Sequence, residues 1–150
     1  MKSAWTEERL ERLFVQYNRR FWGGRLPKIH IRIRNLGGFH GRIEWEHREI
    51  LIDIDSHSTD REIRDTLLHE LCHLATARKR GHGSAFWAEV EKLLRQKAPI
   101  TAGCPEAPGL KILKDVVPTR FPLARRLMQK AERKRARDVE KWLGRKTPTP

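Results

Sequence analysis

Two histidines four residues apart, His69 and His73, are the residues of this 150-residue chain best placed to do chemistry. If the segment is helical, this spacing puts both imidazoles on one face, with roughly 5–6 Å between their Cβ atoms. Two ring nitrogens can then reach one metal ion at about 2.0–2.1 Å each. Glu70 follows the first histidine and lies on the flank of the same face. A carboxylate there can hold a metal-activated water and take its proton, which is hydrolytic chemistry.

A third histidine, His82, is the candidate third ligand. It lies nine residues after His73, between two glycines, which suit a tight reversal of the backbone toward the helix. A zinc ion that does chemistry usually has three protein ligands and one open position. The pattern therefore predicts a metal site at His69, His73 and His82, with Glu70 as general base. The alternatives are solvated histidines or a structural metal site, although a structural zinc site would more often use cysteines.

The element that must carry His69, Glu70 and His73 reads as a helix that begins near Thr59. Thr59 and Glu62 fit a capping box. An apolar stripe, expected to be buried, lies well away from the histidines and consists of Ile63, Leu67, Leu71 and Leu74. One side of the helix is therefore expected to pack on the core while the other faces a cleft. A second helix is expected over residues 84–96, where an aromatic pair, Phe86-Trp87, anchors the corner that aims the third histidine.

The first third of the chain reads as one helix followed by three short strands. Residues 3–22 place apolar side chains at helical spacing, and two glycines and a proline end that helix. The period then changes to two, which predicts strands at residues 29–33, 39–45 and 49–55. Because the connections are short, we expect a small antiparallel meander. The four other histidines are expected to be exposed strand or turn residues and not ligands: His30, His40, His47 and His57.

The C-terminal part of the chain differs in composition from the rest. Residues 99–118 contain four prolines and two glycines, which predict an extended linker. Residues 119–150 carry eleven Lys/Arg against three acidic residues, a net +8 of the total +13. They predict a basic helix over 121–143 and a disordered end. We therefore divide the chain into a domain at 1–98, a linker at 99–118 and a basic C-terminal segment at 119–150.

Charge and composition limit the partners and the compartment. The net charge of +13 and a pI near 10.5 favour a polyanionic partner such as DNA or another nucleic acid. A solvated basic helix that only aids solubility is the alternative. The sequence has no apolar run of about 18 residues and no apolar segment near its N-terminus. Its cysteines, Cys72 and Cys104, do not make a disulfide framework. These features favour the cytoplasm, where the protein could associate with the nucleoid.

Three segments resemble the SprT-like (Spartan-type) zinc metallopeptidase family. Residues 17–27 are similar to its N-terminal signature, the His69-Glu70-x-x-His73 helix to its active-site helix, and Gly81-His82-Gly83-x-x-Phe86 to its third-ligand segment. The resemblance implies His69, His73 and His82 as ligands of one Zn²⁺ per chain and Glu70 as general base. It also implies an α+β fold, a minimal zincin. Its parts would be an N-terminal helix, a three-stranded antiparallel sheet, the active-site helix and a following helix, here with a basic C-terminal helix. The four-cysteine zinc ribbon of many family members is absent, because only Cys104 lies beyond the domain.

The leading hypothesis is a zinc metalloendopeptidase that hydrolyses peptide bonds through a metal-activated water, acting on protein or peptide substrates that include DNA-associated proteins. One alternative is a zinc hydrolase with a non-protein substrate such as RNA. Another is a nucleic-acid-binding protein whose metal site is structural. The sequence leaves open the physiological substrate, the native metal, the oligomeric state and whether DNA activates or recruits the protein.

Overall fold

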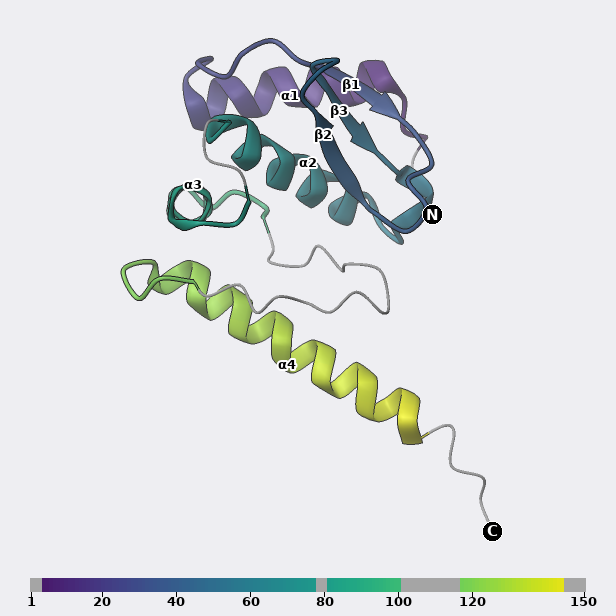
Figure 1. Cartoon of the computed structure of the whole chain (residues 1–150), viewed down its shortest axis with the longest axis vertical. Helices are drawn as coiled ribbons and strands as arrows, with labels where there is room; N and C mark the ends of the chain where they lie inside the picture. Colours follow the sequence, from purple (N-terminus) through teal and green to yellow (C-terminus); the bar gives the residue numbers. More distant parts are fainter. Residues whose placement is uncertain (1–3, 78–80, 101–116, 145–150) are drawn as a thin grey trace.

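The computed structural model describes residues 4–77, 81–100 and 117–144. The elements in chain order are α1 (Glu7–Trp22), β1 (His30–Ile33), β2 (Gly41–Glu44), β3 (Glu49–Ile52), a 3₁₀ turn η1 (Ile54–Ser56), α2 (Asp60–Ala75), α3 (Ser84–Arg95) and α4 (Pro122–Gly144). Figure 1 shows α1, the sheet and α2 in one layered body, with α3 beside α2 and α4 extending away from both. The α+β class predicted from the sequence is confirmed.

Local signals explain the limits of α1. The Thr6 hydroxyl accepts from the backbone N–H of Arg9 at 3.2 Å, so Thr6 is the N-cap. Gly23 ends the helix in the left-handed conformation, at φ 59°, which favours glycine. The buried Asn18 side chain then holds the chain beyond this end, because it bonds both the N–H and the C=O of Leu26, at 3.0 and 3.2 Å. The chain is thereby directed into β1.

The sheet is mixed, so the predicted antiparallel meander is wrong. The strand order is β1-β3-β2, with β1 parallel and β2 antiparallel to β3. The chain crosses from β1 to the far edge of the sheet, and the hairpin at residues 45–48 returns β3 between its two predecessors. Three consecutive apolar residues of β3, Ile50, Leu51 and Ile52, are buried. The most apolar strand thus takes the centre, and the strands that alternate with charged residues take the edges.

Both long N-terminal helices pack against this sheet. α1 contacts β1, while α2 contacts β2 and β3, and α3 packs on α2. The core between them is continuous and includes the stripe predicted for α2: Ile63, Leu67, Leu71 and Leu74. Trp5 fixes the start of the chain to the start of α2 through a 2.8 Å hydrogen bond from its indole N–H to Asp60. α2 is therefore held along most of its length by apolar contacts.

The basic helix predicted over 121–143 is present as α4. Its first turns are packed: Ala124 is fully buried, and Leu127 and Met128 lie against the core. The three-part division of the chain stays a prediction, because most of the expected linker, residues 101–116, lies outside the described residues, as do residues 145–150. Among the described residues, no helix has the length and apolarity needed to cross a bilayer.

Candidate metal centre

The helix α2 begins where its sequence predicts. The Thr59 hydroxyl accepts from the Glu62 N–H at 3.2 Å, and the Glu62 carboxylate accepts from the N–H groups of Ser58 and Thr59 at 2.6 and 3.0 Å. This completes the capping box. Because the start of the helix and its apolar stripe are both fixed, the rotation of α2 about its axis is fixed too. The histidine face consequently points away from the core.

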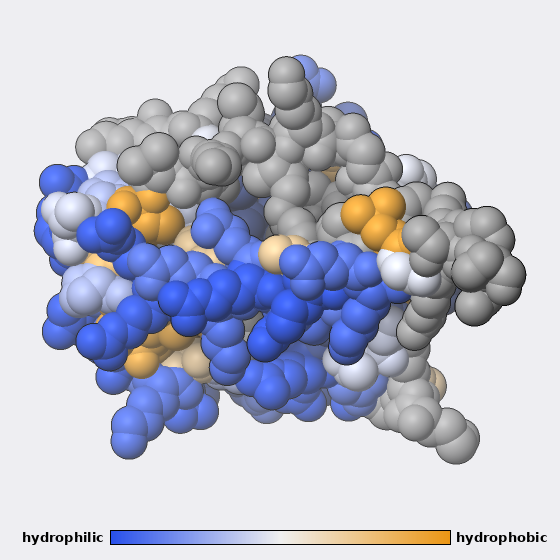
Figure 2. Space-filling view, turned by 90° about the horizontal axis from the view of Figure 1, so that it is seen from below, coloured by the Kyte–Doolittle hydropathy of each residue, from blue (hydrophilic) through white to orange (hydrophobic). Residues whose placement is uncertain are grey.

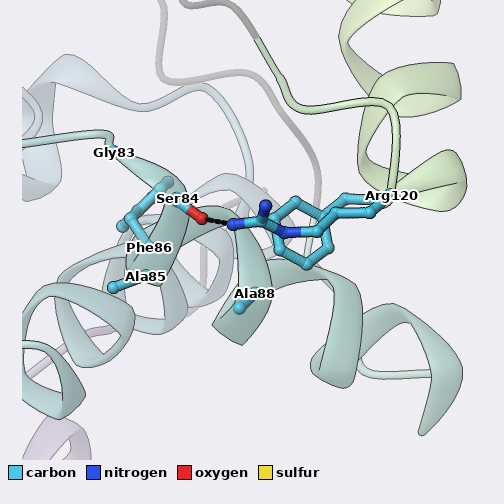
Figure 3. Close-up of a pocket in the computed structure, with 7 residues that line it drawn as sticks. Gly83, Ser84, Ala85, Phe86, Ala88 and Arg120 are labelled. Atoms are coloured by element: carbon cyan, nitrogen blue, oxygen red, sulfur yellow. Dashed lines mark hydrogen bonds between the residues drawn. The ribbon is translucent and has the colours of Figure 1, made fainter.

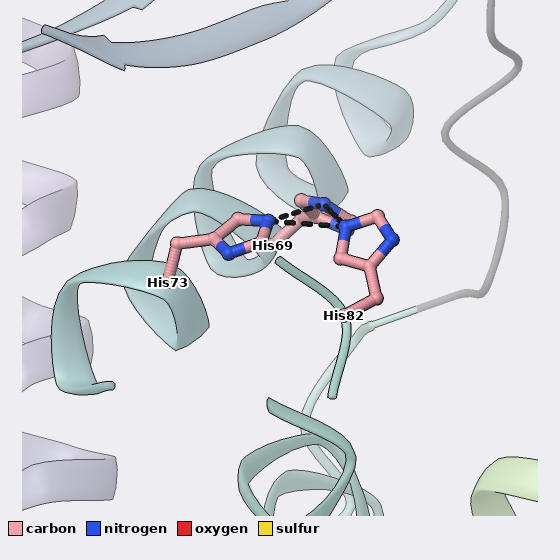
Figure 4. A group of neighbouring side chains, drawn as sticks. All are labelled: His69, His73 and His82. Carbon is pink, nitrogen blue, oxygen red and sulfur yellow. Dashed lines mark hydrogen bonds between the residues drawn. The ribbon is translucent and has the colours of Figure 1, made fainter. Parts of the chain in front are cut away.

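The structure brings the three predicted ligands together. The Nε2 atoms of His69 and His73 are 3.2 Å apart, and that of His82 lies 3.1 Å from each (Figure 4). Three nitrogens bound to one ion at about 2.0–2.1 Å with tetrahedral angles would be about 3.3 Å apart. Hydrogen bonds between neutral imidazoles cannot satisfy all three contacts. Each Nε2 is either a donor or an acceptor, so at least one of the three pairs joins two atoms of the same kind. The donor set and its spacing therefore fit a metal ion; metal binding by these residues stays a prediction.

Aromatic packing holds the triad in place. The buried Phe86 ring lies 5.0, 4.6 and 4.5 Å, centroid to centroid, from the rings of His69, His73 and His82. Trp87 packs on Phe86 and lies 6.1 Å from the His82 ring. These two residues open α3, so the packing of α3 on α2 fixes the position of the third histidine. The anchoring role predicted for the aromatic pair is consistent with these contacts.

Burial keeps His69 and His73 neutral. Desolvation, followed by the charges of the neighbouring histidines, lowers the pKa of His69 well below its usual value. The same causes lower the pKa of His73 to about 4. An imidazole must be deprotonated at the nitrogen that binds a metal. At neutral pH these side chains are therefore in the form that can act as ligands.

Glu70 lies beneath β2 and is only 5% exposed. Desolvation raises the pKa of its carboxyl from 4.5 to about 8. A cation at the neighbouring histidines would lower that pKa again. The space for this side chain exists because position 41 of β2 is a glycine: a Cβ there would lie 3.3 Å from both Cγ and Oε1 of Glu70. The close approach of β2 thus confines the carboxylate beside the triad.

A buried polar cluster next to Glu70 was not predicted. His57 is only 4% exposed, so the expectation of an exposed turn residue is wrong for this histidine. Its Nδ1 donates to the Asp53 carbonyl at 2.6 Å, and its Nε2 accepts from the Thr66 hydroxyl at 2.7 Å. Burial lowers the pKa of His57. The cluster joins η1 to α2 one turn before Glu70. The one feature of the sequence that could have indicated this cluster is Asp53, whose carboxylate caps η1.

Comparison with protein families gives a match over most of this body. The model of the SprT-like family matches residues 10–105, more than half of the chain. The chain belongs to the SprT-like family. The resemblance inferred from the three sequence segments is thus confirmed, and all three lie within the matched range. Residues 117–144, which include α4, lie beyond it.

Comparison with individual proteins adds one structure. No curated protein matches this SprT-like chain. A solved structure, the crystal structure of the metallopeptidase zymogen of Pyrococcus abyssi abylysin, is similar with 28% sequence identity and a TM-score of 0.48. The similarity covers 60% of this chain and 84% of that one.

Proposed function

We propose that this SprT-like protein is a zinc-dependent metalloendopeptidase with His69, His73 and His82 as zinc ligands and Glu70 as general base. The observation that carries the proposal is the convergence of three Nε2 atoms within 3.2 Å beside a buried carboxylate. A purely structural metal site does not require a desolvated glutamate on its flank. Burial of an unpaired carboxylate is destabilising, and a structural site gains no function from it.

The residues around the proposed zinc site have different roles in hydrolysis. Zn²⁺ at such a site acts as a Lewis acid that activates water and polarises a carbonyl. The Glu70 carboxylate accepts the proton of the attacking water and delivers it to the leaving amine nitrogen. Phe86 excludes solvent from the inner side of the imidazoles and fixes the orientation of their rings. Confinement beneath β2 keeps Glu70 in one position during both proton transfers.

The position of β2 supports a peptide substrate. In the described sheet β2 is an edge strand, so one side of its backbone has no strand partner. Gly41 at its start lies against Glu70. An extended peptide that added to this edge would run past the general base, and edge addition is a common mode of peptide recognition. This geometry favours a polypeptide over a nucleic-acid backbone as the substrate.

Metal content and cleavage together test the proposal. Elemental analysis of the purified protein should find about one zinc per chain. His82→Ala should lose it, whereas His47→Ala, a change at an exposed histidine, should retain it. Glu70→Gln should retain zinc and lose cleavage of an unfolded protein such as casein. Cleavage that survives in Glu70→Gln would refute the assigned mechanism, and zinc that is indifferent to His82 would refute the site.

We further propose that α4 recruits the enzyme to DNA. Seven Lys/Arg side chains are exposed along α4: Arg125, Arg126, Lys130, Arg133, Lys134, Arg137 and Lys141. Figure 2 shows a continuous band of hydrophilic side chains on the face that includes α4. Because binding of Lys/Arg to phosphates releases counterions, affinity should fall steeply with salt. Tethering in this way would raise the concentration of the protease near DNA-bound proteins.

A matched pair of double variants tests the recruitment. Lys134→Gln with Arg137→Gln removes two charges from α4, and Arg12→Gln with Arg19→Gln removes two exposed charges from α1. The α4 variant should reduce the slope of log K against log salt by up to about 1.8, or 0.9 per lost phosphate contact. The α1 variant should leave the slope unchanged. Equal slopes in both variants would contradict a role for α4.

A further inference from the structure

A pocket of about 350 Å³ adjoins the metal centre. One wall is the start of α3, from Gly83 to Ala88, and the other is the pair of residues before α4, Arg120 and Phe121 (Figure 3). Gly83 directly follows the ligand His82. Phe86 lines the pocket and also packs on all three imidazoles. The pocket and the triad are therefore separated by a single side chain.

The outer wall is fastened to the domain by a buried carboxylate. Glu91 of α3 accepts hydrogen bonds from the N–H groups of Leu123 and Ala124, at 3.2 and 2.8 Å, and is only 4% exposed. The Ala124 side chain is fully buried. Phe121 is held from the other side, since its N–H donates to the Pro118 carbonyl at 3.0 Å. Arg120 and Phe121 consequently occupy fixed positions relative to the triad.

The charge in the pocket is positive. The Arg120 guanidinium crosses the pocket to donate to the Ser84 hydroxyl, and it lies 5.0 Å from the centroid of the Phe121 ring (Figure 3). No carboxylate among the described residues forms an ion pair with Arg120. The acids of α3 are used elsewhere: Glu89 binds Lys92 and the Trp22 indole, and Glu91 caps α4. The Arg120 side chain is exposed, and its one hydrogen-bond partner among the described residues is the Ser84 hydroxyl. An incoming carboxylate would be a better partner, because it can accept two parallel bonds from the guanidinium.

We propose that this pocket is a substrate subsite for an acidic side chain, Asp or Glu, of a residue next to the scissile peptide bond. The carboxylate would replace Ser84 as the partner of Arg120, while Phe121 would pack on the aliphatic part of the side chain. Because the pocket lies one side chain from the triad, its occupant must belong to a residue close to the carbonyl that is attacked. This inference rests on the proposed peptidase function.

Part of the proposed subsite lies outside the region of the chain that matches the family model. Arg120 and Phe121 lie beyond residues 10–105, which match the SprT-like family. The specificity is therefore a property that the C-terminal segment of this chain confers, separate from the three ligands and the general base. The two residues before α4 thus have a role at the active site, in addition to the role proposed for the exposed basic length of α4.

Cleavage-site profiling of the zinc-loaded full-length protein tests the subsite. A library of peptides from a digested proteome is incubated with the protein without DNA, and the cleavage sites are read by mass spectrometry. Asp and Glu should be enriched at one fixed position beside the cleaved bond. In single peptides that differ only there, Glu should give roughly two- to fivefold higher kcat/KM than Lys, as expected for an ion pair with an exposed guanidinium. Arg120→Gln should remove the preference, and Arg120→Glu should reverse it.

The control and a binding measurement separate the two proposals. Arg19→Glu makes the same charge change at an exposed site on α1 and should leave the preference intact. Calorimetry with zinc-loaded Glu70→Gln should show tighter binding of the Glu peptide than of the Lys peptide, and this difference should vanish when Arg120→Gln is added. Binding of this kind without any cleavage would support the subsite and refute the peptidase. Cleavage without an acidic preference, or a preference that survives Arg120→Glu, would refute the subsite.

Discussion

Replacement of Gly41 by alanine probes the fit between β2 and the general base. The added methyl would lie 2.7 Å from Cγ2 of Thr66 and 3.3 Å from Cγ and Oε1 of Glu70. Carbon atoms pack best at about 3.5–4.0 Å, so the contact with Thr66 is too short by at least about 0.8 Å (3.5 − 2.7). Either β2 must move away from α2 or the two side chains must shift.

The consequences for stability and for activity differ in size. Overpacking of a core costs about 1–3 kcal/mol, and the short contact to a β-branched side chain places Gly41→Ala in that range. A displacement of a catalytic group by about 1 Å can cost on the order of 100-fold in rate. The 3.3 Å contacts with Glu70 require a smaller shift, so we expect kcat to fall by about 10- to 100-fold. Zinc content should not change, because the atoms nearest to a Cβ at position 41 belong to Thr66 and Glu70 and not to the three histidines.

A second substitution turns this expectation into a sharp test. Thr66→Ser removes the Cγ2 atom that clashes but keeps the hydroxyl that donates to His57. The double variant Gly41→Ala with Thr66→Ser should therefore be more stable than the two single effects predict, by about 1 kcal/mol or more. Its kcat should recover only in part, since the contact with Glu70 remains.

The assays are chemical denaturation, zinc analysis and peptide hydrolysis on the same preparations. Gly144→Ala is the control, because a Cβ at Gly144 meets nothing within 4 Å. Full stability and full kcat in Gly41→Ala would refute the reasoning, and so would a loss of activity that tracks a loss of zinc. A double variant whose effects simply add would show that Thr66 is not the obstacle.

Three further outcomes are expected. Glu91→Gln weakens a carboxylate cap on α4, so amide exchange in the first turn of α4 should quicken by the equivalent of about 1–3 kcal/mol, whereas Glu132→Gln on the exposed face should not change it. His57→Ala leaves the Thr66 hydroxyl unpaired and should cost about 2–4 kcal/mol at pH 7, against less than about 0.5 for His47→Ala. Because burial lowers the folded-state pKa of His57, the unfolded chain binds more protons; stability is therefore lost as the pH falls below about 6.5, and the cost of His57→Ala should be smaller at pH 5. Chelation of the metal should lower the Tm of the wild type but not of His82→Ala.

Local patterns account for the parts of the fold that were predicted. The limits of α2 follow from Thr59 and Glu62, which bond within four residues of each other. The three predicted ligands lie within residues 69–82, so helical spacing and one reversal between glycines suffice to bring them together. The prediction of the metal site therefore needed no knowledge of distant contacts.

Non-local contacts decide the parts that were missed. The strand order depends on a parallel pairing between residues 30–33 and 49–52. The short connections between consecutive strands do not predict this pairing. His57 carries no periodic signal, and its burial depends on Asp53 and Thr66 from two different elements. For the enclosure of Glu70 by β2, Gly41 was the available clue, since a glycine inside a strand indicates a close approach of another part of the chain.

The predicted ligand set and the general base of the proposed site differ in the sequence separation of the residues that form them. The ligands span only residues 69–82, so joining α2 to α3 closes a short loop at small entropic cost. The burial of Glu70 instead requires β2, whose Gly41 is 29 residues away along the chain (70 − 41). Folding can therefore assemble the ligand set before the general base is enclosed. A local opening of the β2 edge would, in the same way, leave a metal bound while hydrolysis stops.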